Sequence, residues 1–260
     1  PLNIVGRPTV QLRLSSDKPQ AFVCVRLNDV RPDGTVSRAA YGILNLSHRD
    51  SHEKPTKMKP GTFYTVEVAL KGCAESIPAG HKLRVAVSTS YWPMIWPSPE
   101  NARITLDTAR CSIDLPVLRS EAGFKQVKFA PVEYATPLKM TSKTAATKER
   151  SVKHDIEAQR THFVQDQSDG WSVINDIGTE TSFSKRKEFW VSRNDPSDCE
   201  SMVTCTEHFR RGNWDARVET QTHLSSDKKN FYLKATIRTF DKGKKFIERK
   251  FDHTFKRDHM

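Results

Sequence analysis

Residues 78–99 read Pro78-Ala79-Gly80-His81-Lys82-Leu83-Arg84-Val85-Ala86-Val87-Ser88-Thr89-Ser90-Tyr91-Trp92-Pro93-Met94-Ile95-Trp96-Pro97-Ser98-Pro99, and this stretch decides the fold class expected for the chain. Gly80 marks a turn at its start. The side chains that follow alternate with the two-residue period of a half-buried strand, with Leu83, Val85 and Val87 on one side and Arg84, Ala86 and Ser88 on the other. We therefore expect a strand over residues 82–90.

The second half of the stretch has the composition of an irregular loop. Its three prolines remove backbone donors and fix φ, which excludes an ordinary strand. Large apolar groups are concentrated on it: Tyr91, Trp92, Met94, Ile95 and Trp96. Loops normally run over the surface, so this many apolar groups need a cover, either from this chain or from a partner. We predict that residues 91–97 form a docking surface; the alternative is a plug that closes the end of its own domain.

The same strand pattern extends over residues 1–131. Short alternating runs include Val10-Leu12-Leu14, Val23-Val25-Leu27 and Tyr64-Val66-Val68-Leu70, followed by runs near residues 104–106 and 111–115. The turn Arg31-Pro32-Asp33-Gly34 has proline, aspartate and glycine where a β-turn favours them. Evenly spaced short strands with this punctuation predict an all-β sandwich.

The composition changes after this region. Residues 132–152 are rich in Pro, Thr, Lys, Ser and Ala, and we interpret them as a connecting segment. Residues 153–260 return to longer alternating runs, around 214–219, 231–238 and 247–255, with short polar links between them. Consecutive strands with short links predict a second domain built as an antiparallel meander.

Four stretches in the first domain carry a family resemblance: Gly80–Ser88 with its aromatic-proline loop, Asn28–Gly34, Gly42–Arg49 and Pro60–Val66. Taken in their order along the chain, they resemble the C-terminal β-domain of the X-prolyl dipeptidyl-peptidase and cocaine esterase group of serine hydrolases. The resemblance implies that residues 1–131 form a jelly-roll sandwich of the galactose-binding type. Residues 153–260 resemble the C-terminal extension of one subgroup, through Asp195-Pro196, Gly212-Asn213-Trp214 and Lys256–Met260.

The resemblance also implies where the chemistry of such a hydrolase lies. In that family a Ser-His-Asp triad, with the serine on a Gly-x-Ser-x-Gly elbow, stands on a preceding α/β domain and hydrolyses an ester or the peptide bond after an X-Pro dipeptide. This chain contains no such pentapeptide, so we assign it no catalytic residue and expect it to be inactive alone. Because it begins with Pro1, we expect a fragment whose α/β-hydrolase domain, the partner of the 91–97 loop, belongs to the same polypeptide.

Other candidate sites have simpler interpretations. Cys199, Cys205 and His208 lack a common zinc spacing and an evident fourth ligand. His48 and His81 have the right side chain for acid–base chemistry, but turn hydrogen bonds or contacts with a neighbouring domain explain them more simply. Asp29 and Asp33 lack the alternating oxygen ligands of a calcium loop. We predict no metal and no cofactor.

Composition limits the remaining function classes. The net charge is +11, with basic clusters at Lys185-Arg186-Lys187, Lys228-Lys229 and Lys242–Lys245, but they are interrupted by acidic residues and no nucleic-acid motif accompanies them. We therefore expect a solvated basic surface and no nucleic-acid partner. No apolar run reaches membrane-spanning length, so no membrane partner is expected either.

Two further features complete the expectations. Five irregularly spaced cysteines, an odd number, favour reduced thiols and a cytoplasmic location, with Cys24 and Cys111 as small buried hydrophobes. The first alternative function is a carbohydrate-binding module, in which Trp92 and Trp96 would stack on sugar rings. A basic nucleic-acid adaptor ranks last. No pattern selects an oligomeric state.

Overall fold

The computed structural model describes residues 1–120 and 128–260. The chain divides into two compact units, Pro1–Phe129 together with His259–Met260, and Ala130–Asp258. Apart from two short 3₁₀ turns, at Leu46–His48 and Thr108–Arg110, the regular structure of the described residues is entirely β-strand. None of the helices in this part of the chain is long and apolar enough to cross a membrane.

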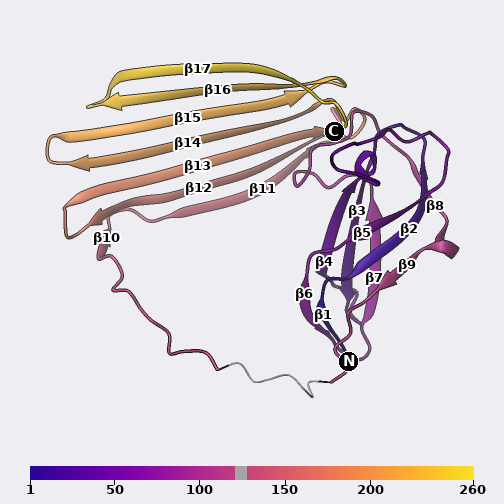
Figure 1. Ribbon diagram of the computed structural model, residues 1–260. Coiled ribbons are helices and arrows are strands. Elements are labelled where there is room, and N and C mark those ends of the chain that lie inside the picture. The colour runs from indigo at the N-terminus through magenta and orange to yellow at the C-terminus, as the bar shows by residue number, and fades with distance from the viewer. Residues whose placement is uncertain (121–127) are drawn as a thin grey trace. The chain divides into compact units, whose positions relative to one another are not determined.

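The first unit contains strands β1 to β9 (Figure 1). Their bounds are β1 Leu2–Gly6, β2 Thr9–Ser16, β3 Phe22–Val30, β4 Val36–Asn45, β5 Tyr64–Ala69, β6 Cys73–Ile77, β7 Lys82–Ser88, β8 Ile104–Leu106 and β9 Ser112–Asp114. Strands β4, β3 and β7 form one antiparallel sheet in that order, and β5, β2 and β8 form a second, to which β9 adds by pairing with β2. Strands β1 and β6 pair separately.

The hydrophobic core lies between the two larger sheets. Val10, Leu12 and Leu14 of β2 are at most 2% exposed. Val23, Val25 and Leu27 of β3 are fully buried and belong to the same cluster, together with Val66 and Val68 of β5. Each such side chain contributes roughly 1.5–3 kcal/mol by leaving water. The predicted all-β sandwich is confirmed, and the alternation of apolar residues in β2 and β3 is what places one face of each sheet inside.

The β3–β4 hairpin closes on the predicted turn. Gly34 donates its N–H to Arg31 O at 2.9 Å and has φ +84°, a conformation that glycine adopts without strain. Asp33 Oδ1 accepts from the Thr35 N–H at 2.9 Å and from the Thr35 hydroxyl at 2.7 Å. The carboxylate therefore fixes its own turn.

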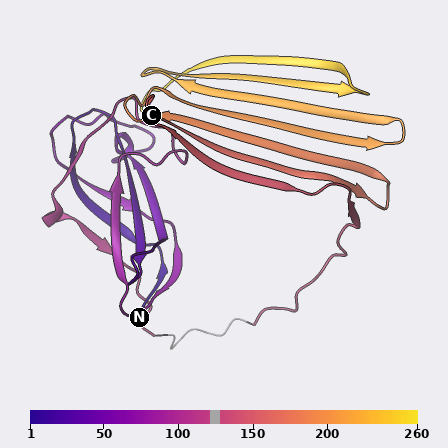
Figure 2. The same cartoon turned by 180° about the vertical axis from the view of Figure 1, so that it is seen from behind.

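The second unit is one antiparallel sheet of eight strands, seen as a single layer from both sides (Figures 1 and 2). Its strands are β10 Met140–Ser142, β11 Thr147–Asp155, β12 Arg160–Ile174, β13 Thr179–Ser192, β14 Cys199–Arg211, β15 Trp214–Ser226, β16 Asn230–Asp241 and β17 Lys244–Lys256. Strands β12 to β17 pair strictly with their neighbours in sequence, which confirms the predicted antiparallel meander.

The connecting segment predicted over residues 132–152 is shorter than expected. Within it, residues 132–139 and 143–146 have no strand or helix, whereas β10 and β11 both pair with β12. The prediction failed here because β11 carries mostly polar side chains, such as Lys148, Glu149 and Arg150, which are exposed. An edge strand held by backbone hydrogen bonds does not need the apolar alternation on which the prediction depended.

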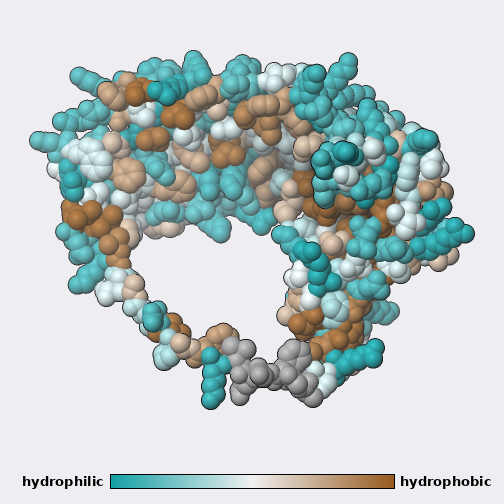
Figure 3. Space-filling model, in the orientation of Figure 1, coloured by the Kyte–Doolittle hydropathy of each residue, from teal (hydrophilic) through white to brown (hydrophobic). Residues whose placement is uncertain are grey.

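The two faces of this sheet differ in chemistry. We call them the Lys185 face and the Arg186 face, since successive residues of a strand point to opposite sides. By register the Lys185 face carries mainly apolar rows, which include Phe183, Phe189, Val203, Leu224, Leu233 and Phe251. The Arg186 face carries ion pairs such as Arg186–Asp166 and Arg238–Glu248. Polar and apolar side chains are interspersed over the side of the molecule seen in Figure 3.

Candidate functional site

The aromatic loop predicted from sequence follows β7 directly. It turns tightly at Tyr91, whose carbonyl oxygen accepts from the N–H groups of Met94 at 2.8 Å and Ile95 at 3.2 Å. The peptide bond between Trp92 and Pro93 is cis. Met94 is 54% exposed, whereas Tyr91, Trp92, Ile95 and Trp96 are half-buried. The five residues named from sequence therefore share one loop, and Met94 alone among these five is exposed.

Tyr91 is anchored to the sheet formed by β4, β3 and β7. Its hydroxyl accepts a hydrogen bond from Arg38 Nη1. Its ring packs edge-on against Tyr41, with centroids 5.9 Å apart and an interplanar angle of 71°. The guanidinium of Arg26 lies 5.4 Å from the ring centroid of Tyr91, within the range of a cation–π contact. These contacts hold the first residue of the loop on the side of β3 that faces away from the core.

The two tryptophans of the loop contact each other. The rings of Trp92 and Trp96 pack edge to face, with centroids 5.2 Å apart and an interplanar angle of 76°. Stacking on a sugar needs an exposed flat ring face, and this arrangement, with both rings half-buried, offers little of it. The carbohydrate-binding alternative gains no support from the pair.

A shallow groove adjoins the loop. Its volume is about 390 Å³, and its lining residues come from the link between β1 and β2, from β4, from the end of β5 and the residues after it, and from the loop: Arg7, Tyr41, Gly42, Ile43, Ala69, Leu70, Lys71 and Met94. The Nζ of Lys71 lies 5.0 Å and the guanidinium of Arg38 4.5 Å from the centroid of the Tyr41 ring. The groove thus combines an apolar floor with cationic groups around Tyr41, and Met94 is part of its lining.

Sequence reasoning missed the residues that support the loop. Arg26, Arg38, Tyr41 and Lys71 are far from residue 91 in sequence and belong to no motif. Register alone brings two of them together, because Arg26 pairs with Tyr41 across β3 and β4. Alternation does put the Arg26 side chain on the other face of β3 from the core residues Val25 and Leu27. A charged residue at that position is a weak signal that this face of β3 is polar.

The histidines and aspartates named from sequence have local structural partners. His81 Nδ1 lies 2.8 Å from Asp29 Oδ1, so these two candidates meet each other. His48 lies on the short 3₁₀ turn, with its Nδ1 3.3 Å from Nδ1 of His52. Burial, followed by the nearby imidazoles of His52 and His259, lowers the pKa of His48 and favours its neutral form.

The cysteines and histidine considered as metal ligands are separated by the strand geometry. Cys205 and His208 lie on opposite faces of β14, because they are three residues apart in one strand. His208 Nε2 contacts Asp215 Oδ1 at 2.6 Å instead. Over residues 1–120 and 128–260, no group of three or more His, Cys, Asp or Glu side chains is placed to hold a metal ion.

The thiols are all free. Cys24 is fully buried on β3, and burial, opposed by the nearby charge of Arg26, raises its pKa to about 11. Cys111 is half-buried and packs against the core cluster. Cys199 is 2% exposed, and burial raises its pKa to about 11. A thiol with so high a pKa is protonated at neutral pH and is a poor nucleophile.

Comparison with known families gives a match over residues 1–168 to the X-Pro dipeptidyl-peptidase C-terminal non-catalytic domain. The match includes Pro1–Phe129 of the first unit and extends to Ser168 in β12 of the second. It covers more than half of the chain. The four stretches that resemble this family lie inside the matched range.

Curated relatives agree with this match. The chain is 28% identical over 93 residues to the cocaine esterase of Rhodococcus sp. (strain MB1 Bresler), covering 36% of this chain and 16% of that enzyme. It is 30% identical over 83 residues to a putative Xaa-Pro dipeptidyl-peptidase of Streptomyces avermitilis, covering 32% of this chain and 12% of the relative. The chain therefore matches only a small part of the length of either protein.

Two solved structures are similar at lower identity. One is an α-amino acid ester hydrolase, 22% identical with a TM-score of 0.43, covering 45% of this chain and 24% of that one. The other is an aminopeptidase from a marine sediment archaeon, Thaumarchaeota archaeon, 17% identical with a TM-score of 0.43 and the same coverage of 45% and 24%.

Proposed function

Because the chain belongs to the family of X-Pro dipeptidyl-peptidase C-terminal non-catalytic domains, we propose that it packs on and shapes the catalytic domain of a serine hydrolase. That α/β-hydrolase domain would belong to the same polypeptide and would cleave an acyl ester or an X-Pro peptide bond. The two curated relatives carry such activities in their names, and this chain spans a small part of each. The chain itself contributes no nucleophile elbow.

The observation that carries the proposal is the exposed side chain of Met94 in the lining of the groove. A methionine that is 54% exposed beside an apolar floor gives a partner an adaptable contact. The turn at Tyr91 is already fixed by Arg38 and Tyr41, so docking would order little additional backbone. Preorganisation of this kind lowers the entropic cost of association. We therefore assign the domain contact to Met94 and the groove rather than to the half-buried tryptophans.

The docking proposal is tested with Met94→Glu. The catalytic domain from the same reading frame and the present chain are produced separately, and their association is measured by titration calorimetry. A carboxylate at this position replaces an apolar contact and has to be desolvated on docking, so we expect the Kd to rise at least about tenfold. Since the Met94 side chain is exposed, the melting temperature of the variant chain should differ from that of the unchanged chain by less than about 2 °C.

The matched control is Phe63→Glu, which places the same charge on a side chain that is 38% exposed before β5. It should leave the affinity within about twofold. Equal losses from both variants, or unchanged binding by Met94→Glu, would contradict the proposed contact. Neither result would alter the family assignment.

The non-catalytic role has its own test. The isolated chain is assayed with p-nitrophenyl acetate and with an X-Pro anilide, and we expect no turnover above a heat-denatured sample. Turnover that a serine-directed phosphonate abolishes would show a nucleophile in this chain and would refute the proposal.

A further inference from the structure

The basic run Lys185-Arg186-Lys187 is divided between the two faces of the second sheet. Arg186 points to its own face, where Nη1 lies 2.7 Å from Asp166 Oδ2 and Nη2 lies 3.1 Å from Glu188 Oε1. Lys185 and Lys187 point to the opposite face and are half-buried. The basic cluster therefore consists of one guanidinium that is neutralised by carboxylates on one face and two lysines on the opposite face.

The two lysines meet two further cations from the edge strand β11. In register, Lys148 is opposite Gln167 and Gln167 is opposite Lys185. One step along, Arg150 is opposite Gln165 and Gln165 is opposite Lys187. Because neighbouring strands are about 4.8 Å apart, each row places a glutamine amide between two cations. These six side chains form what we call the cation pocket: Lys148, Arg150, Gln165, Gln167, Lys185 and Lys187.

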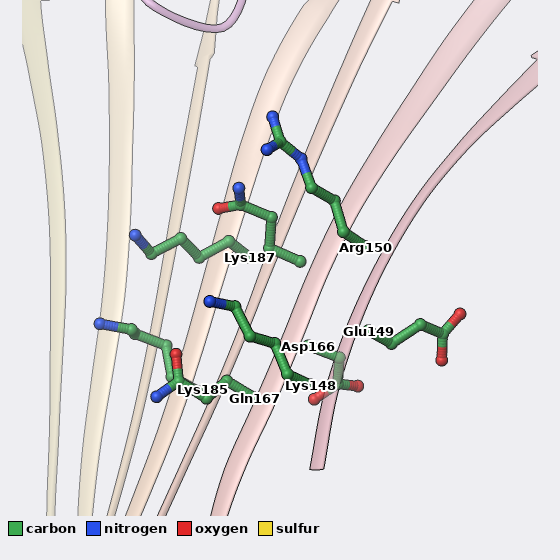
Figure 4. Close-up of a pocket in the computed structure, with 8 residues that line it drawn as sticks. Lys148, Glu149, Arg150, Asp166, Gln167, Lys185 and Lys187 are labelled. Carbon is green, nitrogen blue, oxygen red and sulfur yellow. The ribbon is translucent and has the colours of Figure 1, made fainter.

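The cation pocket is a real depression with a defined charge. It has a volume of about 230 Å³ and is also bordered by Glu149 and Asp166. Figure 4 shows Lys148, Lys185 and Lys187 extending to one side of the strands, while the carboxylate of Glu149 points away. Asp166 is already engaged by Arg186 on the other face.

Among the residues that the structure describes, the four cations have no acidic partner of their own. Within the described part of the chain, none of Lys148, Arg150, Lys185 and Lys187 lies within ion-pair distance of a carboxylate, although many other basic residues of this sheet do. Aromatic rings hold two of them in place: Arg150 lies 5.0 Å from the Phe163 centroid, and Lys185 Nζ lies 5.6 Å from the Phe183 centroid. Like charges gathered in this way repel one another until an anion joins them.

We propose that the cation pocket binds a phosphate group. Four cations favour a ligand that carries more than one negative charge, which a phosphate monoester supplies and a single carboxylate does not. Arg150 and the lysine ammonium groups are suited to phosphate oxygens, and the two glutamine amides add neutral donors. The volume of about 230 Å³ is below the usual range for a whole drug-sized ligand, so the pocket holds the charged group of a larger molecule. This site lies in the second unit and does not depend on the proposed docking loop.

The test is calorimetric titration of the 260-residue chain with inorganic pyrophosphate and with inorganic phosphate at low salt. We expect saturable binding at one site, tighter for pyrophosphate because of its higher charge. Removing two charge-assisted contacts with Lys185→Gln and Lys187→Gln together should raise the Kd at least about tenfold. The matched control, Lys234→Gln with Lys250→Gln, removes the same charge from the Arg186 face of the sheet and should change the Kd by less than about twofold.

A second variant guards against misfolding. Lys148→Gln with Arg150→Gln alters two exposed residues of the edge strand and should weaken binding similarly without lowering the melting temperature. Absence of saturable binding by the unchanged chain would overturn the proposal. An equal loss in the Lys234/Lys250 control would overturn it as well, since it would show attraction to net charge alone.

Vesicle binding distinguishes two sources of the phosphate group, a lipid headgroup and a soluble phosphate ester. Vesicles of phosphatidylcholine with phosphatidic acid, compared with phosphatidylcholine alone, test a lipid headgroup. Binding that requires phosphatidic acid and is lost in Lys185→Gln/Lys187→Gln supports the pocket with a lipid source. Binding of pyrophosphate without vesicle binding supports it with a soluble phosphate ester. Single-stranded RNA that binds more tightly than pyrophosphate, in proportion to its length, would replace this proposal with a nucleic-acid surface.

Discussion

His81 and Asp29 form a shielded pair that joins the turn before β7 to the end of β3. The imidazole Nδ1 lies 2.8 Å from Oδ1 and 3.0 Å from Oδ2 of the carboxylate. Their side chains are only 16% and 13% exposed. Asp29 is also opposite Leu83 in the register of β3 and β7. The contact with His81 therefore fixes the start of β7 against β3, the central strand of the sheet.

Removal of the carboxylate should destabilise the first unit. We expect Asp29→Ala to lower the free energy of unfolding by about 1–3 kcal/mol, because the shielded imidazole loses its partner. The control is Asp50→Ala, whose side chain is 70% exposed beside Arg49 and should cost less than about 1 kcal/mol. Urea unfolding at neutral pH measures both. A double-mutant cycle with His81→Ala that gives no coupling energy would contradict the structural importance of the pair.

A second prediction concerns the close approach of two backbones below the groove. A Cβ added at Gly42 in β4 would lie 2.4 Å from the carbonyl oxygen of Ala69 and 3.0 Å from Leu70 Cδ2. Gly42→Ala should therefore destabilise the chain by about 1–3 kcal/mol, because backbone atoms must move. At Gly72 the same methyl group would meet only Gly6 O, at 3.7 Å. Gly72→Ala should be neutral within about 0.5 kcal/mol, and equal effects of the two changes would refute this explanation.

Much of the first unit was predictable because large apolar side chains that face the core recur at every second position of β2 and β3. The alternation in β2 and β3 follows from the burial of Val10, Leu12, Val23 and Val25. Strands β1 and β6 escaped prediction. Both are short, and in β6 only Ile77 is buried. A short strand that buries only one or two side chains does not need an alternation of apolar residues, so its sequence carries little signal of a strand.

The two candidate sites also differ in how far the sequence predicts them. The loop from Tyr91 to Trp96 was identified because its residues are consecutive and unusual in composition. The cation pocket was not, because its two halves are separated by more than thirty residues of chain and meet only through the β11–β12–β13 register. In the sequence, Arg186 forms one basic cluster with Lys185 and Lys187, but strand alternation puts its side chain on the other face of the sheet.

A third prediction concerns acid behaviour at the turn between β15 and β16. Asp227 accepts hydrogen bonds from the Tyr232 hydroxyl at 2.7 Å and from the N–H groups of Lys229 and Asn230 at 2.6 and 2.7 Å. These bonds, that from Tyr232 first, lower its pKa from 3.8 to about 2. A lowered pKa in the folded state means that the contribution to stability is fully present above pH 3.8 and is lost as the pH falls through about 2.

Carbon-13 titration of the aspartate carboxyl groups checks this directly. Tyr232→Phe removes the largest cause and should raise the pKa of Asp227 toward 3.8. The stability difference between the unchanged chain and Asp227→Asn should shrink between pH 4 and pH 2. An Asp227 signal that titrates near 3.8 in the unchanged chain would show that the turn does not hold the carboxylate as described.

The last prediction concerns where a protease first enters the chain. Residues 128–139 have no strand or helix, and Phe129 and Tyr134 are 88% and 86% exposed. A protease needs an exposed segment that is free to adopt an extended conformation in its active site, so chymotrypsin should cut first after these residues. Phe255 is the matched control, because it is 52% exposed but paired with Phe231 in the β16–β17 ladder. Mass spectrometry of a brief digest identifies the first cuts. Early cleavage after Phe255, or within β11 at Thr147–Asp155, would mean that the edge strands open more readily than the connection between the units.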